Sequence, residues 1–332
     1  MHSNLFKDIV HVPVLLREVL ENLPVPTSGR ILDLTVGLGG HAKAILALAD
    51  VNTCYVGLDR DPIARQQTMS TLGHDPRLTI VAGNYEDIWE DYEFKALLNT
   101  VAPDGFDVVL MDLGVSSLQL KDSSRGFSFQ ISGPLDMRMN PESGITALEW
   151  LANQTDTSLA DTIYNYGEER FSRPIARAIL KSLNQGTLNT TLDLAAAVYT
   201  VLSRNAARQR RQIDPATRTF QAIRIAVNGE LHRLSGAITS AVRSLKPGGR
   251  LGVISFHSLE DRIVKQTLRR LSGVYDGPGR IAPQPLPQYL RLIHAGGFKA
   301  SESELAVNPP SRSARLRIGE RLNCLRSFGA SL

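Results

Sequence analysis

The residues with the clearest capacity for chemistry lie in one turn, Ile31-Leu-Asp-Leu-Thr-Val-Gly-Leu-Gly-Gly-His-Ala42. Asp33 ends an apolar run, and Gly37 and Gly39 follow it after four and six residues. Glycine permits a tight turn and leaves no Cβ in the way of an approaching ligand. A helix that starts at His41 would point free backbone N–H groups at that ligand. The turn is therefore a candidate binding site.

This turn alone leaves three interpretations open. Gly37-x-Gly39-x-x-Ala42, with the acid Asp59 about 20 residues further on, satisfies a loose dinucleotide-binding fingerprint. The same glycines also satisfy the loop of a methyl-donor site, in which an acid ends the strand and the glycines follow it. The third interpretation is a glycine turn of an α/β domain that binds no ligand.

Polar side chains also end the strands predicted after this turn. Three runs are almost continuously apolar, as expected of strands buried on both faces: Cys54–Asp59, Leu78–Asn84 and Phe106–Asp112. Strands that alternate with helices predict a doubly wound parallel α/β sheet. Ligands of such sheets bind beyond the carboxyl ends of the strands. We expect Asp33, Asp59, Tyr85 and Asp112 to lie together at that edge.

These strand ends favour a methyl donor over a dinucleotide. A hydride-transfer enzyme needs a Lys, His or Tyr in a second domain, and the sequence offers no obvious one. A methyl-donor site needs an acid for the ribose hydroxyls, a side chain against the adenine and a polar group near the methyl. Asp59, Tyr85 and Asp112 match these three requirements in order. The sequence thus predicts S-adenosylmethionine as the cofactor and a class I, Rossmann-like methyltransferase sheet.

The strand–helix alternation is interrupted after Asp112. A loop over residues 122–141 is too long for a simple connection, and its apolar residues argue against disorder. Helical patterns follow around residues 146–152, 158–166, 173–183 and 191–203. The sequence therefore predicts an inserted all-helical, substrate-recognition domain over residues 117–215.

The sheet resumes in the last third of the chain. Apolar residues that step at three or four predict one long helix over Phe220–Ser244. A fifth strand follows it and ends before His257, and Tyr289–Ala300 and Ala314–Leu322 predict a closing pair of strands. We expect residues 1–116 and 216–332 to form one discontinuous methyltransferase domain.

The bulk composition is that of an ordinary globular protein with a mild positive charge. The chain has 332 residues, a formal net charge of +4 and 42% hydrophobic residues. Its two cysteines, Cys54 and Cys324, exclude a disulfide scaffold, and no zinc-ligand spacing is present, so we expect no metal. Neither a signal peptide nor an apolar run of membrane-spanning length is found. We expect a cytoplasmic protein without a membrane partner.

The positive charge is unevenly distributed. Arginines crowd two segments: Arg204, Arg208, Arg210, Arg211, Arg218 and Arg224 in the first, and Arg312, Arg315, Arg317, Arg321 and Arg326 in the second. Clustered arginines are typical of surfaces that bind nucleic-acid phosphates. For the first of these segments, the sequence therefore favours contact with phosphates over a merely solvated basic face.

The chain carries a series of distinctive short runs, in this order: His11-Val-Pro-Val-Leu-Leu16, Gly39-Gly-His41, Leu58-Asp-Arg-Asp-Pro62, Asp112-Leu-Gly-Val-Ser-Ser117, Arg125-Gly-Phe-Ser-Phe129, Gly133-Pro-Leu-Asp-Met-Arg-Met139, Tyr166-Gly-Glu-Glu-Arg-Phe171, Thr217-Arg-Thr-Phe-Gln-Ala222, Ile225-Ala-Val-Asn228, Ser255-Phe-His-Ser-Leu-Glu-Asp-Arg262 and Arg312-Ser-Ala-Arg-Leu-Arg317. Taken together, these runs resemble the RsmH (MraW) family of bacterial 16S ribosomal RNA cytosine-N4 methyltransferases over nearly the whole length.

The resemblance implies a set of residues that bind the methyl donor: Gly39, Gly40, His41, Asp59, Tyr85, Asp112 and Gln119. Gln119 comes from the resemblance alone. Leu34, Val36 and Leu38 depart from the smaller or more polar residues usual in the family's glycine turn, and we expect them to pack behind it. None of these departures removes a donor-contacting group.

The resemblance also implies N4-methylation of a cytidine in the decoding region of small-subunit (16S) ribosomal RNA. Asp112 is the candidate acceptor of the amino proton, and His257 and Glu260 are candidates for contact with cytosine or phosphate. The candidate RNA-binding residues are Arg138, Arg208, Arg210, Arg211, Arg218 and Arg312.

The expected partner is small-subunit ribosomal RNA or the 30S subunit, and a homodimer is one option for the assembly. Two alternatives stay open at this stage. One is a related methyltransferase that acts on another, organellar ribosomal RNA. The other is a non-catalytic RNA-binding module that retains the donor pocket.

Overall fold

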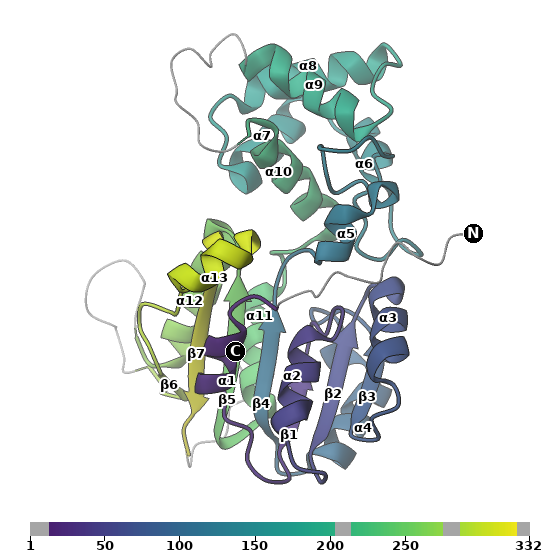
Figure 1. The fold of residues 1–332 in the computed structure, drawn as a ribbon. Coiled ribbons are helices and arrows are strands. Elements are labelled where there is room, and N and C mark those ends of the chain that lie inside the picture. The colour runs from purple at the N-terminus through teal and green to yellow at the C-terminus, as the bar shows by residue number, and fades with distance from the viewer. Residues whose placement is uncertain (1–12, 203–213, 275–285, 324–332) are drawn as a thin grey trace. The chain divides into compact units, whose positions relative to one another are not determined.

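The computed structural model describes residues 13–202, 214–274 and 286–323 (Figure 1). The chain divides into two compact units, one formed by residues 1–114 and 233–332 and the other by residues 115–232. Among the described residues, no helix has the length and hydropathy needed to cross a membrane.

The first unit is built on a seven-stranded sheet of order β3-β2-β1-β4-β5-β7-β6. The strands are β1 (Arg30–Asp33), β2 (Cys54–Asp59), β3 (Leu78–Ala82), β4 (Phe106–Asp112), β5 (Leu245–Ser255), β6 (Leu290–Leu292) and β7 (Arg315–Arg321). β1 to β5 run parallel, and β7 runs antiparallel between β5 and β6. The predicted α/β fold is confirmed.

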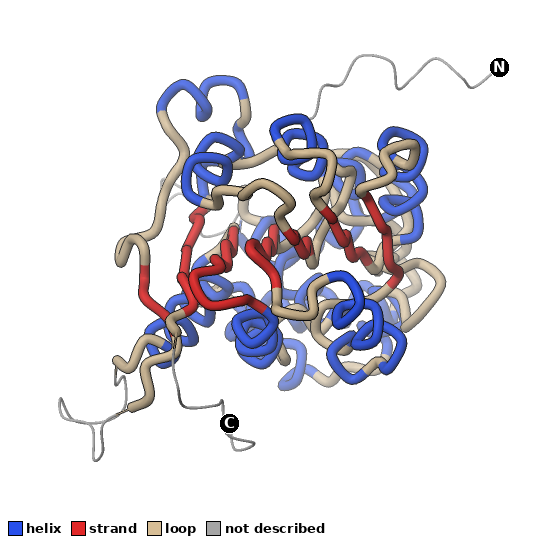
Figure 2. The backbone as a smooth tube through the Cα atoms, turned by 90° about the horizontal axis from the view of Figure 1, so that it is seen from below, coloured by secondary structure: helices blue, strands red, loops and turns tan. Residues whose placement is uncertain are grey.

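Helices cover both faces of this sheet (Figure 2). The helices of this unit are α1 (Leu16–Asn22), α2 (Gly40–Leu48), α3 (Pro62–Leu72), α4 (Tyr92–Val101), α11 (Leu234–Ser244), α12 (Ser258–Leu271) and α13 (Glu302–Val307), with 3-10 turns η1 (Ile88–Glu90) and η4 (Pro309–Ser313). Because both faces are covered, the central strand β4 is apolar along most of its length, and Val108, Val109 and Leu110 are fully buried.

The second unit is helical. It contains α5 (Ser117–Lys121), η2 (Ser123–Arg125), α6 (Ala147–Ala152), α7 (Asp156–Gly167), α8 (Ser172–Asn184), α9 (Thr191–Leu202) and α10 (Ala216–Asn228). Its core is separate from that of the sheet and includes the fully buried Leu151, Ile163, Ile175, Ile179 and Leu194. α6, α7, α8, α9 and α10 each bury apolar residues in this core.

The helix predicted over Phe220–Ser244 is in fact two helices that belong to different units. Gly229 ends α10 in the left-handed conformation, at φ 66°, and α11 begins at Leu234. Phe220 and Ile223 on α10 pack in the core of the helical unit. The helical unit thus ends at residue 232 instead of the expected 215. The apolar spacing continues through the break, so periodicity alone does not reveal it.

Candidate active site

Three carboxylates end neighbouring parallel strands in the first unit. Asp33 is the last residue of β1, Asp59 of β2 and Asp112 of β4. β1 pairs with β2 on one side and with β4 on the other, both in parallel. The three acids consequently share one edge of the sheet, where ligands of doubly wound folds bind.

The glycine turn after β1 is packed firmly on one side. A Cβ on Gly39, whose φ is 76°, would lie 2.9 Å from Leu72 Cδ1, and one on Gly40 would lie 2.7 Å from Pro13 Cγ. A Cβ on Gly37 would meet only the Thr35 carbonyl oxygen, at 3.7 Å. The turn is thus held from behind and open at Gly37, as a backbone site for a ligand requires.

The apolar residues that interrupt this turn lie where we expected them. Leu34 and Val36 are buried in the unit, and Leu38 is half-buried. They therefore support the turn from the interior of the unit.

Asp59 fixes the shape of the turn. Its Oδ2 accepts a hydrogen bond from the Gly37 amide and its Oδ1 one from the Asp61 amide, both at 2.8 Å. Burial raises the pKa of the Asp59 carboxyl, and these two backbone hydrogen bonds oppose the increase. A carboxylate has about four acceptor positions, so Asp59 can also accept hydrogen bonds from two ribose hydroxyls.

Asp33 is buried beneath the site and is held by a residue that the sequence did not point out. Tyr55 on β2 donates its hydroxyl to Asp33 Oδ2 at 2.7 Å, and the Thr35 amide donates to Asp33 Oδ1 at 3.0 Å. Burial raises the pKa of Asp33 to about 6. The Thr35 hydroxyl oxygen in turn accepts from the Asp112 amide at 2.6 Å. This chain of contacts ties β2 to the carboxyl ends of β1 and β4.

Tyr55→Phe tests this buried contact. We expect the free energy of unfolding to fall by about 1–3 kcal/mol, because a buried acceptor loses its donor. The Tyr55 hydroxyl favours the ionised form of Asp33, so the loss should be larger above pH 6 than below it. Denaturant unfolding at pH 5 and pH 8 measures both values. Equal losses at the two pH values would contradict the role assigned to the hydroxyl.

Asp112 has one carboxylate oxygen that no described residue binds. Its Oδ1 is buried and has no hydrogen-bond partner among the described residues, while its Oδ2 lies 3.7 Å from His41 Nδ1. Burial is the largest cause of a pKa of Asp112 well above its usual range, and the negative charges of Asp33 and Glu260 raise this pKa further. An unused buried carboxylate oxygen is rare in native structures and marks a place for a ligand or a proton.

His257 and Glu260 lie at the end of β5, where α12 begins. His257 caps the helix, with Nδ1 accepting from the Glu260 amide at 3.4 Å, and its Nε2 lies 3.1 Å from Glu260 Oε1. Glu260 Oε2 accepts from the Phe256 amide at 2.8 Å. Glu260 is therefore a buried support of this turn, and its charge contributes to the raised pKa of Asp112.

The other two candidate donor contacts are placed differently. Tyr85 is half-buried just after β3. Gln119 belongs to the helical unit, where its Oε1 accepts from the Ser116 amide at 2.9 Å and closes the first turn of α5. Its contact with the donor remains a prediction.

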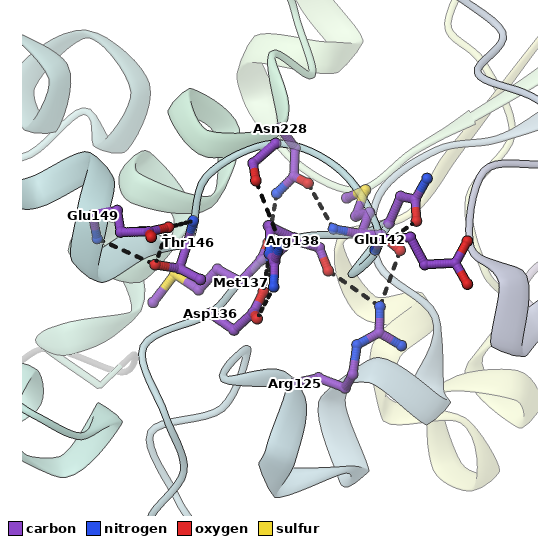
Figure 3. Close-up of polar contacts among 11 residues, drawn as sticks. Arg125, Asp136, Met137, Arg138, Glu142, Thr146, Glu149 and Asn228 are labelled. Carbon is purple, nitrogen blue, oxygen red and sulfur yellow. Dashed lines mark hydrogen bonds and ion pairs between the residues drawn. The ribbon is translucent and has the colours of Figure 1, made fainter.

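A loop of the helical unit is fixed by side chains that bind its backbone (Figure 3). Asn228 donates to the Met137 carbonyl and accepts from the Met139 amide, both at 2.7 Å. The Arg125 guanidinium donates to the carbonyls of Arg138 and Met139 at 3.1 and 3.0 Å. These contacts hold Met137, which is fully buried, at a φ of 57°. The loop over residues 122–141, which we expected to be too long for a simple connection, is thus an ordered element.

The candidate RNA-binding arginines have different environments. Arg138 forms a bidentate ion pair with Asp136, at 2.9 and 2.7 Å. Two of its guanidinium N–H donors are therefore already bound within the loop. Arg218 is half exposed and lies 3.7 Å from the buried Glu169, and Arg312 is exposed in η4. Arg208, Arg210 and Arg211 lie outside the described residues.

Sequence reasoning missed Tyr55 and Thr35 as parts of the site. A tyrosine within an otherwise apolar strand is a usable signal, because a buried phenol hydroxyl needs a hydrogen-bond partner. The identity of that partner follows only from the pairing of β1 with β2.

The sheet with its reversed β7, the glycine turn and the strand-end acids define a class I methyltransferase that uses S-adenosylmethionine. The residues present fit this cofactor, because the turn is open at Gly37 and Asp112 has a buried, unused acceptor. When bound, S-adenosylmethionine supplies a methyl group on a sulfonium sulfur. Asp59 would hold its ribose, and Tyr85 its adenine.

Comparison with known proteins identifies the family. The model of the MraW methylase family matches residues 8–322. Ribosomal RNA small subunit methyltransferase H of Xanthomonas campestris pv. campestris strain 8004 is 46% identical over 313 residues, covering 94% of this chain and 87% of that protein. The corresponding protein of Acinetobacter baumannii strain AYE is 44% identical, covering 94% of this chain and 98% of that protein.

This chain belongs to the MraW methylase family, and the resemblance inferred from its motifs is confirmed. It is an S-adenosylmethionine-dependent methyltransferase. Among solved structures, an rRNA methylase from Streptococcus thermophilus aligns with a TM-score of 0.37 at 11% identity, covering 93% of this chain and 92% of that one.

Proposed function

We propose that this enzyme methylates N4 of a cytidine in the decoding region of small-subunit ribosomal RNA, in the cytoplasm. The relatives that align along almost its whole length are named as ribosomal RNA small subunit methyltransferases. One observation supports an amino group as the methyl acceptor: the buried Oδ1 of Asp112 has no hydrogen-bond partner among the described residues. An amino nucleophile has a proton to lose, and this carboxylate can accept it.

The chemistry of cytosine explains why an acceptor is needed. The N4 lone pair is delocalised into the ring, so N4 attacks a methyl group poorly. A carboxylate that accepts an N4–H bond orients the amino group and takes up the positive charge that develops during attack. Alignment of N4 with the methyl group accounts for much of the remaining rate enhancement.

The raised pKa of Asp112 suits this role. A general base is most effective when its pKa lies near the working pH, and burial with Asp33 and Glu260 moves the pKa of Asp112 upward. We propose that His257 and Glu260 complete this edge, with His257 contacting cytosine or phosphate. Glu260 sets the charge around Asp112 and the position of the turn after β5.

The arginines provide the RNA contact in this proposal. N4 is engaged in a paired base, so the target cytidine has to be single-stranded or flipped out. Arg138, Arg218 and Arg312, together with Arg208, Arg210 and Arg211, would neutralise phosphates around it. The helical unit contributes most of these positions.

Arg312→Ala tests one such contact. We expect weaker RNA binding and a salt dependence whose logarithmic slope is smaller by about 1, because one phosphate contact is lost. Binding titrations at several salt concentrations measure the slope. Lys95→Ala removes a half-exposed lysine on α4 and is the matched control. An unchanged slope for Arg312→Ala would remove this residue from the interface.

The decisive experiment compares N4-methylcytidine in small-subunit ribosomal RNA from cells with and without the gene, by nucleoside mass spectrometry. Loss of the nucleoside in the deletion strain, restored by the gene, is the expected result. Unchanged levels would contradict the assignment, and transfer of methyl to another RNA in vitro would favour the organellar-type alternative. Donor and RNA binding without any turnover would favour the non-catalytic module. Assays with naked RNA and with 30S subunits test which form of the substrate the enzyme methylates. Sedimentation of the enzyme tests whether it is a homodimer.

A further inference from the structure

The hydrogen bond of His41 to the backbone defines which ring nitrogen can accept a proton. His41 lies in the first turn of α2, its side chain is 7% exposed, and its Nε2 lies 3.1 Å from the carbonyl oxygen of Val14. A carbonyl oxygen can only accept, so Nε2 carries a hydrogen. In the neutral ring, Nδ1 is then an acceptor without a proton.

This acceptor nitrogen faces another acceptor. Asp112 Oδ2 lies 3.7 Å from His41 Nδ1, and an ionised carboxylate beside a neutral imidazole nitrogen gives two lone pairs without a proton between them. One added proton makes the contact attractive. It can reside on Asp112 and be donated to Nδ1, or reside on Nδ1 of a charged ring beside the carboxylate. Hydrogen bonds of this kind often tighten only in the reacting complex.

The groups around the pair favour a proton there. Asp33 at the end of β1 and Glu260 on α12 face Asp112 and add negative charge, and burial acts in the same direction on its pKa. Tyr55 and Thr35 also contact Asp33. His41, on α2, is the neighbour of Asp112 that can become positive. A proton held between His41 and Asp112 offsets this concentration of carboxylates.

We propose that His41 and Asp112 form a single proton-sharing pair that receives the proton of the methylated amino group. His41 is a positioning residue in this proposal, because it acts through the Asp112 carboxylate. The inference rests on the proposed function for the identity of the amino group, but the pairing of the two side chains is a property of the enzyme alone.

The step balances as follows. N4 forms a bond to the methyl carbon while the bond from that carbon to sulfur breaks, and its electron pair remains on the sulfur. N4 then gives one proton to the Asp112 carboxylate, and His41 Nδ1 shares it. The pair therefore starts without the shared proton, ends with it, and releases it to solvent before the next turnover.

His41→Gln is the informative variant. Glutamine Nε2 can keep the hydrogen bond to the Val14 carbonyl, so the local fold is retained, but it offers no titratable nitrogen to Asp112. We expect kcat, measured at saturating donor, to fall about 10- to 100-fold. The acidic limb of the pH–rate profile should move to lower pH, because the site binds its proton less tightly. His74→Gln changes an exposed histidine and should leave kcat and the profile unaltered.

A second measurement separates this proposal from the choice of substrate. ¹⁵N NMR of the His41 ring in the RNA-free enzyme should show Nε2 protonated in the neutral form. The midpoint of the ring titration should move to lower pH in Asp112→Asn. An unmoved midpoint, or a wild-type kcat and pH profile for His41→Gln, would overturn the pair. Loss of cytosine methylation in the cellular test with these NMR results intact would overturn only the proposed function.

Discussion

Asp112→Ala is expected to reduce kcat by about 100- to 10,000-fold, the contribution that a positioned general base makes. Asp112 is the strand-end acid with an unused buried acceptor, and it lies beside both His41 and Glu260. Single-turnover methylation of RNA under saturating donor measures the chemical step directly. A rate close to that of the wild type would remove Asp112 from the mechanism.

Asp112→Asn distinguishes a loss of catalysis from a loss of folding, because we expect this variant to lose activity and to gain thermal stability. The pKa of Asp112 is higher in the folded protein than in the unfolded chain. Above the unfolded-state pKa of Asp112, this difference lowers the free energy of unfolding. Asparagine has no such cost, so Asp112→Asn should raise Tm at pH 7 while activity is lost. The gain should shrink as the pH falls towards the unfolded-state pKa, where Asp112 is protonated in both states. Glu93→Gln, at an exposed acid on α4, is the control for both measurements.

Asp59→Ala is expected to raise the Kd for S-adenosylmethionine about 100-fold. The carboxylate holds the Gly37 and Asp61 amides, and we assign the ribose hydroxyls to its remaining acceptor positions. Loss of about 3 kcal/mol of charge-assisted hydrogen bonding corresponds to this change in affinity. Calorimetric titration of the donor into the variant measures it.

Asp59→Asn distinguishes the two roles of this side chain. An amide retains one acceptor oxygen, so it can hold one of the two backbone amides but has no charge to offer the ribose. We therefore expect an affinity between those of the wild type and Asp59→Ala. If both variants bind the donor as tightly as the wild type, Asp59 shapes the turn and has no part in donor binding. Glu93→Ala is the matched surface control.

The strands and their polar ends could be predicted because the signals are local. Each parallel strand is a short apolar run that stops at Asp33, Asp59 or Asp112, and burial on both faces requires such a run. Parallel strands in one sheet then place these acids at one edge. The sequence alone therefore determined the fold class and the position of the candidate site within it.

The division into units could not be read from the sequence in the same way. Apolar spacing runs through Gly229 without interruption, although the chain turns there and α10 and α11 join different cores. Periodicity records which face of a helix is buried but not the partner that buries it. Only the tertiary packing of Phe220 and Ile223 decided that α10 belongs to the helical unit.

The sequence also determined that His41 follows the glycine turn and that Tyr55 belongs to the second strand. It did not determine the hydrogen-bond partners of their polar atoms. The Tyr55 hydroxyl finds Asp33 because β1 pairs with β2. The ring of His41 lies between Val14 and Asp112 because α2 starts beside the ends of β1 and β4. Partners of buried polar groups are set by contacts between residues distant in the chain, and these contacts exist only once the tertiary structure has formed.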